Sequence, residues 1–424
     1  MIGLKETAEK HPCFDIKARL KYARIHLPVA PKCNVQCNYC NRKYDCVNES
    51  RPGVTSAVLS PAQALNYLRT ISQRITNIST IGIAGPGDAF AEPQKTIETI
   101  RLIKQEFPDK IFCLSSNGLD IEPFIDDLAE LDVTHVTLTI NSLRVETLEK
   151  IYSWVRFRKK LYRGRAGAEV MHQQQMKSLK ALCDKGIKVK VNTIFIPGVN
   201  DTEVAGVAKE VAGMGATTFN CLPLIPAEGS KMKNVPKPER SAISETVKEV
   251  SKYIKPMTHC ARCRADAAGM LGKDDKNAYA EIHQCSKLPA AISGPNKPHV
   301  AIASYEGLMI NQHLGEARSF HIFRESSDDY HLVEKREAPS KGTGDLRWIE
   351  LGKALDDCSY VLVNGVGKRP VEILAQLGIS VVEMAGLIQD GLDAVYKGKK
   401  LKSVLKTTLS KCGEGCSGNG GGCG

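Results

Sequence analysis

The stretch Ala30–Cys46, APKCNVQCNYCNRKYDC, places three cysteines at positions 33, 37 and 40 and a fourth at position 46. Three thiolates separated by three and then two residues can bind one face of a four-iron cluster and leave one iron without a protein ligand. Four closely spaced thiolates would instead close the site. The spacing therefore predicts an iron–sulfur cluster with an open iron at Cys33, Cys37 and Cys40, and a separate role for Cys46.

Around this stretch, short β-branched runs alternate with helical patterns, which is typical of successive βα units on a parallel sheet. Six strands fit a partial (βα)6 barrel of the α/β class better than a closed eight-stranded barrel. Ligands gather at the carboxyl ends of such strands, so we expect the cysteine loop, which follows the first strand, at the mouth of the barrel. The expected strands are 24–30, 78–84, 111–115, 135–140, 187–195 and 217–224, and the expected helices are 62–75, 93–107, 122–131, 169–185 and 202–214.

The length of 424 residues, with 42% hydrophobic and 25% charged residues, indicates two globular domains. The first spans 1–286, and a segment containing Pro and Gly at 287–298 is expected to be a linker. A second α/β domain is expected at 299–410, from the strand-like HVAIAS, FHIF, YHLVEKREA, YVLVNG and SVVEMAG and helical patterns at 346–356, 370–377 and 387–397. Residues 411–424, rich in Gly and Cys, are expected to form a flexible tail.

The net charge is +11, but the basic residues are scattered except in RFRKKLYRGR at 156–165. We expect that segment to be a solvated loop or helix end, with a basic rim that attracts an anionic cluster or small molecule as the alternative. No groove-reading motif accompanies the charge, so nucleic acid is not an expected partner. An apolar leader and an apolar run of about 18 residues are both absent from the sequence, so we expect a cytoplasmic protein without membrane contact.

The 15 cysteines argue for metal binding, because a reducing cytosol keeps thiols free and clustered cysteines there usually bind metal. A zinc site is the alternative at 33–46, but it normally needs four ligands in paired C-x2-C spacing. Cys412, Cys416 and Cys423 of the tail could also bind metal, at a cost in chain entropy.

The motif Cys33-x3-Cys37-x2-Cys40, with Tyr39 before the last cysteine, resembles the signature of radical S-adenosylmethionine (SAM) enzymes. The resemblance implies that the open iron chelates the amino and carboxylate groups of SAM, and that reduction releases a 5′-deoxyadenosyl radical. It also implies a set of cofactor contacts, namely Tyr39, Gly85 and Gly87 of the GPGD segment, Thr139, Asn141 and Ile194.

Each of these contacts has an ordinary alternative, since Gly-Pro-Gly is a common turn and the other positions could be strand-end hydrogen bonders or core residues. Glu49 could occupy the open iron until SAM displaces it, or could be a loop carboxylate paired with Arg51.

A wider set of segments, HPC, IHLPVAPKCNVQCNYCNRKYDCVNESRPGV, GIAGPGDAF, SSNGL and TLTINS, resembles the NifB family of nitrogenase cofactor biosynthesis proteins. The region from His299 on, with INQHLGEARSFHIF, resembles the NifX/NafY type of domain that binds precursors of the iron–molybdenum cofactor. The family resemblance implies nitrogen fixation as the biological role. It also implies three 4Fe-4S clusters, one for radical chemistry and two as substrates held partly by extensions of the first domain.

The same resemblance implies the ligands of the substrate clusters. Cys46 and Cys113 would hold one cluster together with a histidine, which we expect to be His26 because it lies on the first strand. Cys13 and the pair Cys260-x2-Cys263 would hold the other. The alternatives are His11 as the nitrogen ligand, a buried structural role for Cys113, and a packed strand histidine at position 26. His313 is a candidate for holding the product in the second domain.

By resemblance, one SAM methylates a sulfide of a substrate cluster, and a radical from a second SAM removes hydrogen from that methyl group. The carbon becomes a carbide, and with one added sulfide the two clusters fuse into an 8Fe-9S-C core. The implied partners are an iron–sulfur cluster donor, a reductant and downstream cofactor assembly or carrier proteins. The alternatives are a radical SAM enzyme that modifies a small molecule or peptide with auxiliary clusters, and a non-enzymatic iron–sulfur scaffold or carrier.

Overall fold

The structure, a computed structural model, describes residues 10–286, 297–326, 329–342 and 344–397. The chain divides into two compact units, Met1–Ser286 and Lys287–Gly424. Most of the expected linker at 287–298 and all of the expected tail at 411–424, with its three cysteines, lie outside the described residues. Within the described ranges, every helix is too short or too polar to cross a membrane.

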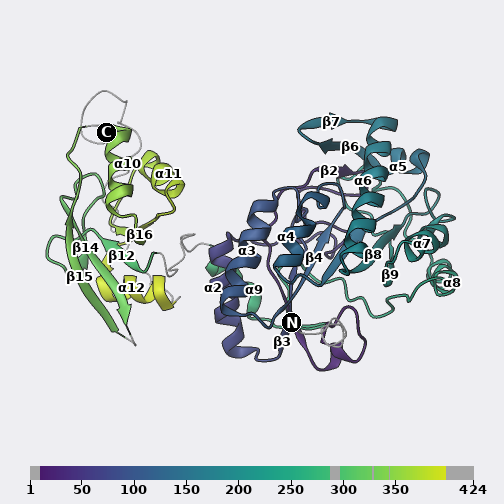
Figure 1. The fold of residues 1–424 in the computed structure, drawn as a ribbon, viewed down its shortest axis with the longest axis horizontal. Coiled ribbons are helices and arrows are strands. Elements are labelled where there is room, and N and C mark those ends of the chain that lie inside the picture. The colour runs from purple at the N-terminus through teal and green to yellow at the C-terminus, as the bar shows by residue number, and fades with distance from the viewer. Residues whose placement is uncertain (1–9, 287–296, 327–328, 343, 398–424) are drawn as a thin grey trace. The chain divides into compact units, whose positions relative to one another are not determined.

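The first unit is built on an eight-stranded sheet with the order β11-β10-β1-β3-β4-β5-β8-β9 (Figure 1). Six neighbouring strands are parallel, and the last two of the unit continue the sheet beside β1 in antiparallel sense. The parallel strands are β1 (Ala23–His26), β3 (Ile78–Ile83), β4 (Ile111–Ser116), β5 (His135–Thr139), β8 (Lys188–Phe195) and β9 (Thr218–Pro223), and the antiparallel pair is β10 (Ala268–Met270) and β11 (Lys273–Asp274).

The prediction of a partial α/β barrel is confirmed, and all six expected strands are present. Their side chains are buried on both faces, as parallel strands covered by helices require. Strand β1 ends at His26 instead of residue 30, because Pro28 has no N–H group to donate to a neighbouring strand.

The five expected helices lie between these strands as α2 (Pro61–Arg74), α3 (Pro93–Glu106), α4 (Ile125–Glu130), α6 (Gly164–Asp184) and α7 (Val204–Gly213). Helix α2 begins at a capping box, in which Ser60 and Gln63 each accept the other's backbone N–H. The first turn of the helix expected at 122–131 is the 3-10 helix η2 (Glu122–Phe124). The sequence reasoning did not foresee the 3-10 helix η1 (Ala18–Leu20), or α5 (Val145–Ile151), α8 (Arg240–Val250) and α9 (Ala278–Cys285).

The basic segment 156–165 is not the loop or helix end that we expected. It contributes to a three-stranded antiparallel sheet of β2 (Val35–Cys37), β6 (Tyr152–Phe157) and β7 (Lys160–Tyr162). The physical reason is alternation, because Val155 is fully buried and pairs with Val35 while Arg156 beside it is exposed. Since β2 carries Cys37, this β6–β7 hairpin supports the cysteine loop.

The second unit has a five-stranded sheet with the order β15-β14-β12-β16-β17. All the expected strands and helices of this domain are present, and an additional short pair of strands, β13 and β18, was not expected. The elements are β12 (His299–Ile302), β13 (Met309–Ile310), β14 (Ser319–Ser326), β15 (Asp329–Glu337), α10 (Asp345–Ala354), β16 (Cys358–Val363), α11 (Lys368–Gln376), β17 (Ser380–Glu383), β18 (Gly386–Leu387) and α12 (Ile388–Lys397).

Candidate functional site

The carboxyl ends of the parallel strands surround two cavities that both contain cysteines. The first, which we call the triad cavity, has about 440 Å³ of open space and is lined by Cys33, Cys37, Cys40 and Cys46. The cysteine loop follows β1, so its position at the mouth of the barrel is the one expected from the sequence.

Burial and neighbouring groups keep the thiols of the triad cavity protonated in the absence of a metal. Burial raises the pKa of Cys33 to about 12 and the pKa of Cys37 and Cys46 well above the ordinary value, and neighbouring thiols raise all three further. Only a strongly thiophilic ion displaces such protons.

The GPGD segment after β3 anchors the cysteine loop. Gly85 has a φ of +141°, which favours glycine. A Cβ atom at Gly87 would collide with the carbonyl oxygen of Lys32, and the backbone N–H of Asp88 donates to that oxygen at 2.7 Å. Gly87 lines the triad cavity and Gly85 does not.

Asp88 is a residue that the sequence reasoning missed. Its carboxylate accepts hydrogen bonds from the backbone of Phe90 at 2.9 Å and of Asn117 at 2.6 Å, and from the Ser116 hydroxyl at 3.2 Å. Burial raises its pKa to about 6, and these hydrogen bonds oppose that shift. Asp88 therefore joins the loops after β3 and β4 beneath the cysteines.

The remaining cofactor candidates fall into two groups. Tyr39 and Thr139 line the triad cavity, whereas Asn141 and Ile194 do not. The Asn141 amide donates to the Tyr39 hydroxyl at 2.9 Å and accepts the Ile194 N–H at 2.9 Å. In this structure Asn141 thus links the cysteine loop to the ends of β5 and β8.

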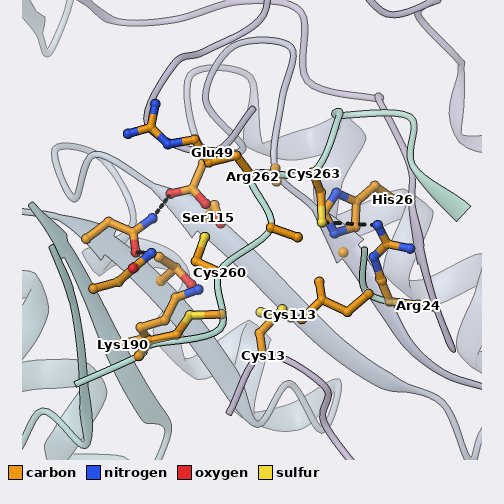
Figure 2. A pocket seen from close by; sticks show the side chains of 18 of the residues that line it. Cys13, Arg24, His26, Glu49, Cys113, Ser115, Lys190, Cys260, Arg262 and Cys263 are labelled. Carbon is orange, nitrogen blue, oxygen red and sulfur yellow. Dashed lines mark hydrogen bonds between the residues drawn. The ribbon is translucent and has the colours of Figure 1, made fainter. Parts of the chain in front are cut away.

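The second cavity, which we call the cysteine–histidine cavity, adjoins the first and has about 650 Å³ of open space (Figure 2). Its ligand-type side chains come from the N-terminal segment, β1, β4 and the segment between α8 and β10. They are Cys13, Cys113, Cys260 and Cys263, together with His11 and His26.

Four thiols share this cavity. Burial raises the pKa of Cys13 to about 12, and the thiols of Cys263, Cys113 and Cys260 raise it further. The cavity is not closed on all sides, because Cys260 is exposed while Cys263 is buried. With His11 and His26 the cavity offers six ligand-type side chains, more than the four of a tetrahedral metal site, and this number suits a larger iron–sulfur assembly.

Arg24 fixes one side of the cavity. Its guanidinium is 1% exposed, donates to the Cys263 sulfur at 3.1 Å and forms an ion pair with Asp274 on β11. A hydrogen bond to the Gly269 carbonyl at 2.6 Å completes the arrangement. A buried cation is thus paired with a carboxylate and aimed at a thiol. Burial raises the pKa of Cys263, and the charge and hydrogen bond of Arg24 oppose that shift.

The two histidines present different nitrogen atoms. His26 Nδ1 lies 3.0 Å from the carbonyl oxygen of Arg264, so Nδ1 carries the proton and Nε2 keeps a free lone pair. His11 Nδ1 accepts the backbone N–H of Cys13 at 3.1 Å, so its proton is on Nε2. Metal-ligating histidines usually donate their second ring N–H to a carbonyl or carboxylate, and His26 meets that condition while His11 does not.

The surroundings of His26 keep it neutral and in place. Burial, with a contribution from the Arg24 charge, lowers its pKa to about 4. A Cβ atom at Gly82 would lie 2.6 Å from the imidazole Cδ2, so the glycine leaves the space that the ring fills.

The two cavities share a wall formed by Asn48, Glu49 and Ser115, all of which line both. Burial raises the pKa of Glu49 to about 7, and its carboxylate accepts a hydrogen bond from the Asn192 amide at 2.9 Å. Arg51 bonds instead to the Arg262 carbonyl at 2.9 Å and pairs with Asp274, so the Glu49–Arg51 pair considered from the sequence is absent.

Lys190 on β8 was also missed. It is 6% exposed and lines the cysteine–histidine cavity, where Figure 2 shows it beside Cys260. Burial lowers its pKa, but the charges of Cys13, Glu49 and Cys113 outweigh that effect and bring it to about 12. The one available signal was a lysine between two valines in a predicted strand.

The structure therefore brings some of the predicted cluster ligands together in one cavity, but not all of them. Cys13, Cys260 and Cys263 share one cavity with Cys113 and His26, whereas Cys46 lies in the triad cavity with Cys33, Cys37 and Cys40.

In the second unit, the candidate His313 is held by its surroundings. Its Nδ1 accepts the Gly315 N–H at 3.1 Å, and a Cβ at Gly365 would lie 2.8 Å from its Cδ2.

Comparison with known proteins places this site in a class. The radical SAM superfamily matches residues 27–211, which hold the triad and the strands β3, β4, β5 and β8. The dinitrogenase iron-molybdenum cofactor family matches residues 296–398. The chain is thus a radical SAM enzyme with a second, NifX-like domain, and the class implies a 4Fe-4S cluster and SAM.

Full-length relatives narrow the class to one family. A protein of Chlorobaculum tepidum described as FeMo cofactor biosynthesis protein NifB is 46% identical over 98% of this chain and 99% of its own length. Proteins of Klebsiella pneumoniae and Frankia alni with the same description are 37% and 36% identical, over 88% and 90% of this chain and 87% of each relative. The chain belongs to the NifB family, whose members take part in biosynthesis of the FeMo cofactor.

Proposed function

We propose that this protein fuses two 4Fe-4S substrate clusters, with insertion of one carbide and one sulfide, into the 8Fe-9S-C precursor of the nitrogenase cofactor. The observation that carries the proposal is the pair of adjoining cavities. One holds the three-cysteine signature, and the other holds four further thiols and a correctly protonated histidine. A radical enzyme acting on an organic substrate would not need the second set.

Cys33, Cys37 and Cys40 would bind the cluster for radical chemistry in the triad cavity. When bound there, the resident cluster and SAM supply a methyl group and a hydrogen-abstracting radical. Thr139, Gly87 and Asp88 line the same cavity and are placed to orient SAM. Glu49 stands between this cavity and the next, with a pKa of about 7, and accepts a proton or an iron contact with little change of position.

One substrate cluster would be bound by Cys13, Cys260 and Cys263. Arg24 supports this assignment because its guanidinium neutralises charge at Cys263 through a hydrogen bond of 3.1 Å. The exposed Cys260 gives this cluster an entrance from solvent.

The other substrate cluster would be bound by Cys46, Cys113 and His26. Cys46 approaches the shared wall from the triad cavity and Cys113 from the cysteine–histidine cavity, as Glu49 and Ser115 follow them closely in sequence. This arrangement favours a cluster at the boundary, next to the source of the methyl group. His26 contributes a neutral ligand, which is released more readily than a thiolate when the clusters fuse.

The second unit would receive the product. Its family match implies handling of cofactor precursors, and we propose His313 as a contact for the fused core. A cluster donor, a reductant and a downstream carrier would complete the cycle.

The proposal is tested by carbon labelling. Anaerobically reconstituted protein is given reductant and SAM with a labelled methyl group, and iron, 5′-deoxyadenosine and S-adenosylhomocysteine are counted. We expect both SAM products and recovery of the label in the extracted iron–sulfur core. Label in an organic product would instead favour an enzyme that modifies a small molecule or peptide, and absence of both SAM products would favour a scaffold.

A further inference from the structure

A third cavity adjoins the triad cavity and shares no lining residue with the cysteine–histidine cavity. It has about 1160 Å³ of open space, and its lining comes from the loops that follow β1, β3 and β4 and from the β6–β7 hairpin. We call it the basic cavity. Five of its lining residues are cationic and one is acidic, and the cations are Lys32, Arg42, Arg156, Arg158 and Lys159.

The basic cavity reaches a predicted cluster ligand. Cys33 and Arg42 line both this cavity and the triad cavity, so the two cavities adjoin at a predicted ligand of the radical cluster. Phe90 and Phe124 also line the cavity, with ring centroids 6.1 Å apart. The Cys33 side of the site is therefore the one that a macromolecule could approach most closely without entering the barrel.

The cations of the hairpin form no ion pair within the described residues. In the part of the chain that the structure describes, no carboxylate pairs with Arg156, Arg158 or Lys159, although Arg165 farther along pairs with Glu146 at 3.2 Å. The one acid of the cavity, Asp120, accepts a hydrogen bond from Asn34 at 2.8 Å. The unpaired cations project from exposed positions.

The turn itself is costly. Arg158 and Lys159 have φ values of 48° and 66°, the left-handed region that glycine or asparagine adopts more easily. The two long cationic side chains at the tip of this turn repel each other, although the Arg158 guanidinium also stacks over the Phe157 ring at 5.2 Å. An anionic surface that meets them would relieve that repulsion.

We propose that the basic cavity and the β6–β7 hairpin are the docking surface for an acidic one-electron carrier protein, of the ferredoxin or flavodoxin kind, which reduces the cluster at Cys33. The inference rests on the proposed radical function and adds the place where the reductant binds. The carrier transfers one electron to the cluster. The carrier is thereby oxidised by one electron and the cluster is reduced by one electron, without transfer of a proton. Opposite surface charge steers such encounters and makes them sensitive to salt.

The test compares two triple variants with the same net charge. The test variant carries Arg156→Glu, Arg158→Glu and Lys159→Glu, and the control carries Lys209→Glu, Lys248→Glu and Lys276→Glu at exposed positions outside the three cavities. Iron-reconstituted proteins are mixed with a reduced acidic bacterial ferredoxin, and the reduced cluster is followed by electron paramagnetic resonance after rapid freezing. Binding of the oxidised ferredoxin is measured by calorimetry.

We expect the wild type and the control to be reduced quickly at low salt and more slowly at high salt. The test variant should be reduced at least roughly tenfold more slowly at low salt, lose most of its salt dependence and bind the ferredoxin weakly. Reduction by dithionite, and 5′-deoxyadenosine formed with dithionite, should be the same in all three proteins.

Equal rates for the test variant and the control would overturn the proposal. So would a wild-type rate that does not depend on salt, or a test variant that binds ferredoxin normally but takes up less iron from a cluster donor. Loss of 5′-deoxyadenosine with dithionite in the wild type would instead count against the radical function itself, so the two failures are distinguishable.

Discussion

The two cysteine cavities of the first unit are built in different ways. The triad cavity takes its three signature cysteines from one loop, residues 33–40, which β2 and the β6–β7 hairpin hold in place. The cysteine–histidine cavity collects its side chains from segments that lie as far apart in sequence as His11 and Cys263. The first is a local motif that the sheet positions, whereas the second exists only after the fold is complete.

Because of this difference, substitutions in the two cavities should have different effects. Changes in the triad should act on radical chemistry alone. Changes in the cysteine–histidine cavity should act on the substrate clusters, because Arg24, Gly82 and Lys190 hold that site together at a distance from the triad. The predictions below test whether the two sites are independent, beginning with the largest expected effect.

Replacement of Cys37 by Ala should reduce formation of 5′-deoxyadenosine and S-adenosylhomocysteine to background, because the radical cluster has only three protein ligands. Iron bound in the cysteine–histidine cavity should remain, since Cys37 does not line it. Product analysis by liquid chromatography and an iron count check the two parts. Full 5′-deoxyadenosine formation by this variant would refute the assignment of the triad.

Replacement of Cys263 by Ala should remove about four iron atoms per chain, the content of one cubane cluster, and abolish core synthesis while 5′-deoxyadenosine formation continues. Cys221→Ala is the matched control, because that thiol is part-buried on β9 and lines neither cysteine cavity. If the Cys263 variant also stops cleaving SAM, the two cavities are not independent and the comparison fails.

Replacement of His26 by Ala should abolish the nitrogen coupling of a substrate cluster, measured by pulsed electron paramagnetic resonance on protein with nitrogen-15 histidine. Gly82→Ala should weaken the same coupling, because the added Cβ would meet the imidazole. His11→Ala should leave it intact, since Nε2 of His11 carries a proton. A coupling that survives in His26→Ala and disappears in His11→Ala would move the ligand to the N-terminal segment.

Replacement of Lys190 by Met should lower the affinity of the cysteine–histidine cavity for iron by roughly tenfold, the effect expected for a group that supports metal ligands without binding the metal. The cation stabilises thiolates at Cys13 and Cys113, and Met keeps most of its volume. Titration with iron and sulfide, followed by absorbance, measures the change. The control Lys188→Met removes a lysine of the same strand that does not line the cavity, and an equal loss there would show a general effect on β8.

Truncation after Lys297 should have the smallest effect, and core synthesis should continue at close to the full rate. The second unit has its own sheet and supplies none of the proposed cluster ligands. Core formed by full-length and truncated protein is compared after extraction. A truncated protein that folds with its full iron content but makes no core would show that the second unit takes part in core synthesis.

The fold was largely predictable because its signals are local. The parallel strands are short runs rich in apolar and β-branched residues, and most of their residues are buried. Helices such as α2 are marked in the sequence by a capping residue. The β6–β7 hairpin was missed because its alternation is hidden under a high density of Arg and Lys. The short helices α5, α8 and α9 lack long apolar stripes of their own.

The site was predictable only where the motif is contiguous. Cys33, Cys37 and Cys40 follow from their spacing, and the x2 spacing of Cys260 and Cys263 also indicates metal ligands. Cys13 and Cys113 gained a role only through family resemblance. Asp88 and Lys190 were missed because nothing near them in sequence shows that the fold buries them beside thiols. The choice between His11 and His26 depends on which ring nitrogen meets a carbonyl, and no sequence pattern contains that information.

The ion pair between Arg24 and Asp274 also has a consequence for the order in which the protein is made. Arg24 lies on the first strand, yet its partner is 250 residues farther along the chain, on the strand that closes the same edge of the sheet. On the ribosome, the triad loop is therefore synthesised long before Cys263 and Asp274 emerge. Delivery of the substrate cluster proposed at Cys13, Cys260 and Cys263 would therefore wait until translation of the first unit is finished, whereas the triad could already be loaded on a nascent chain.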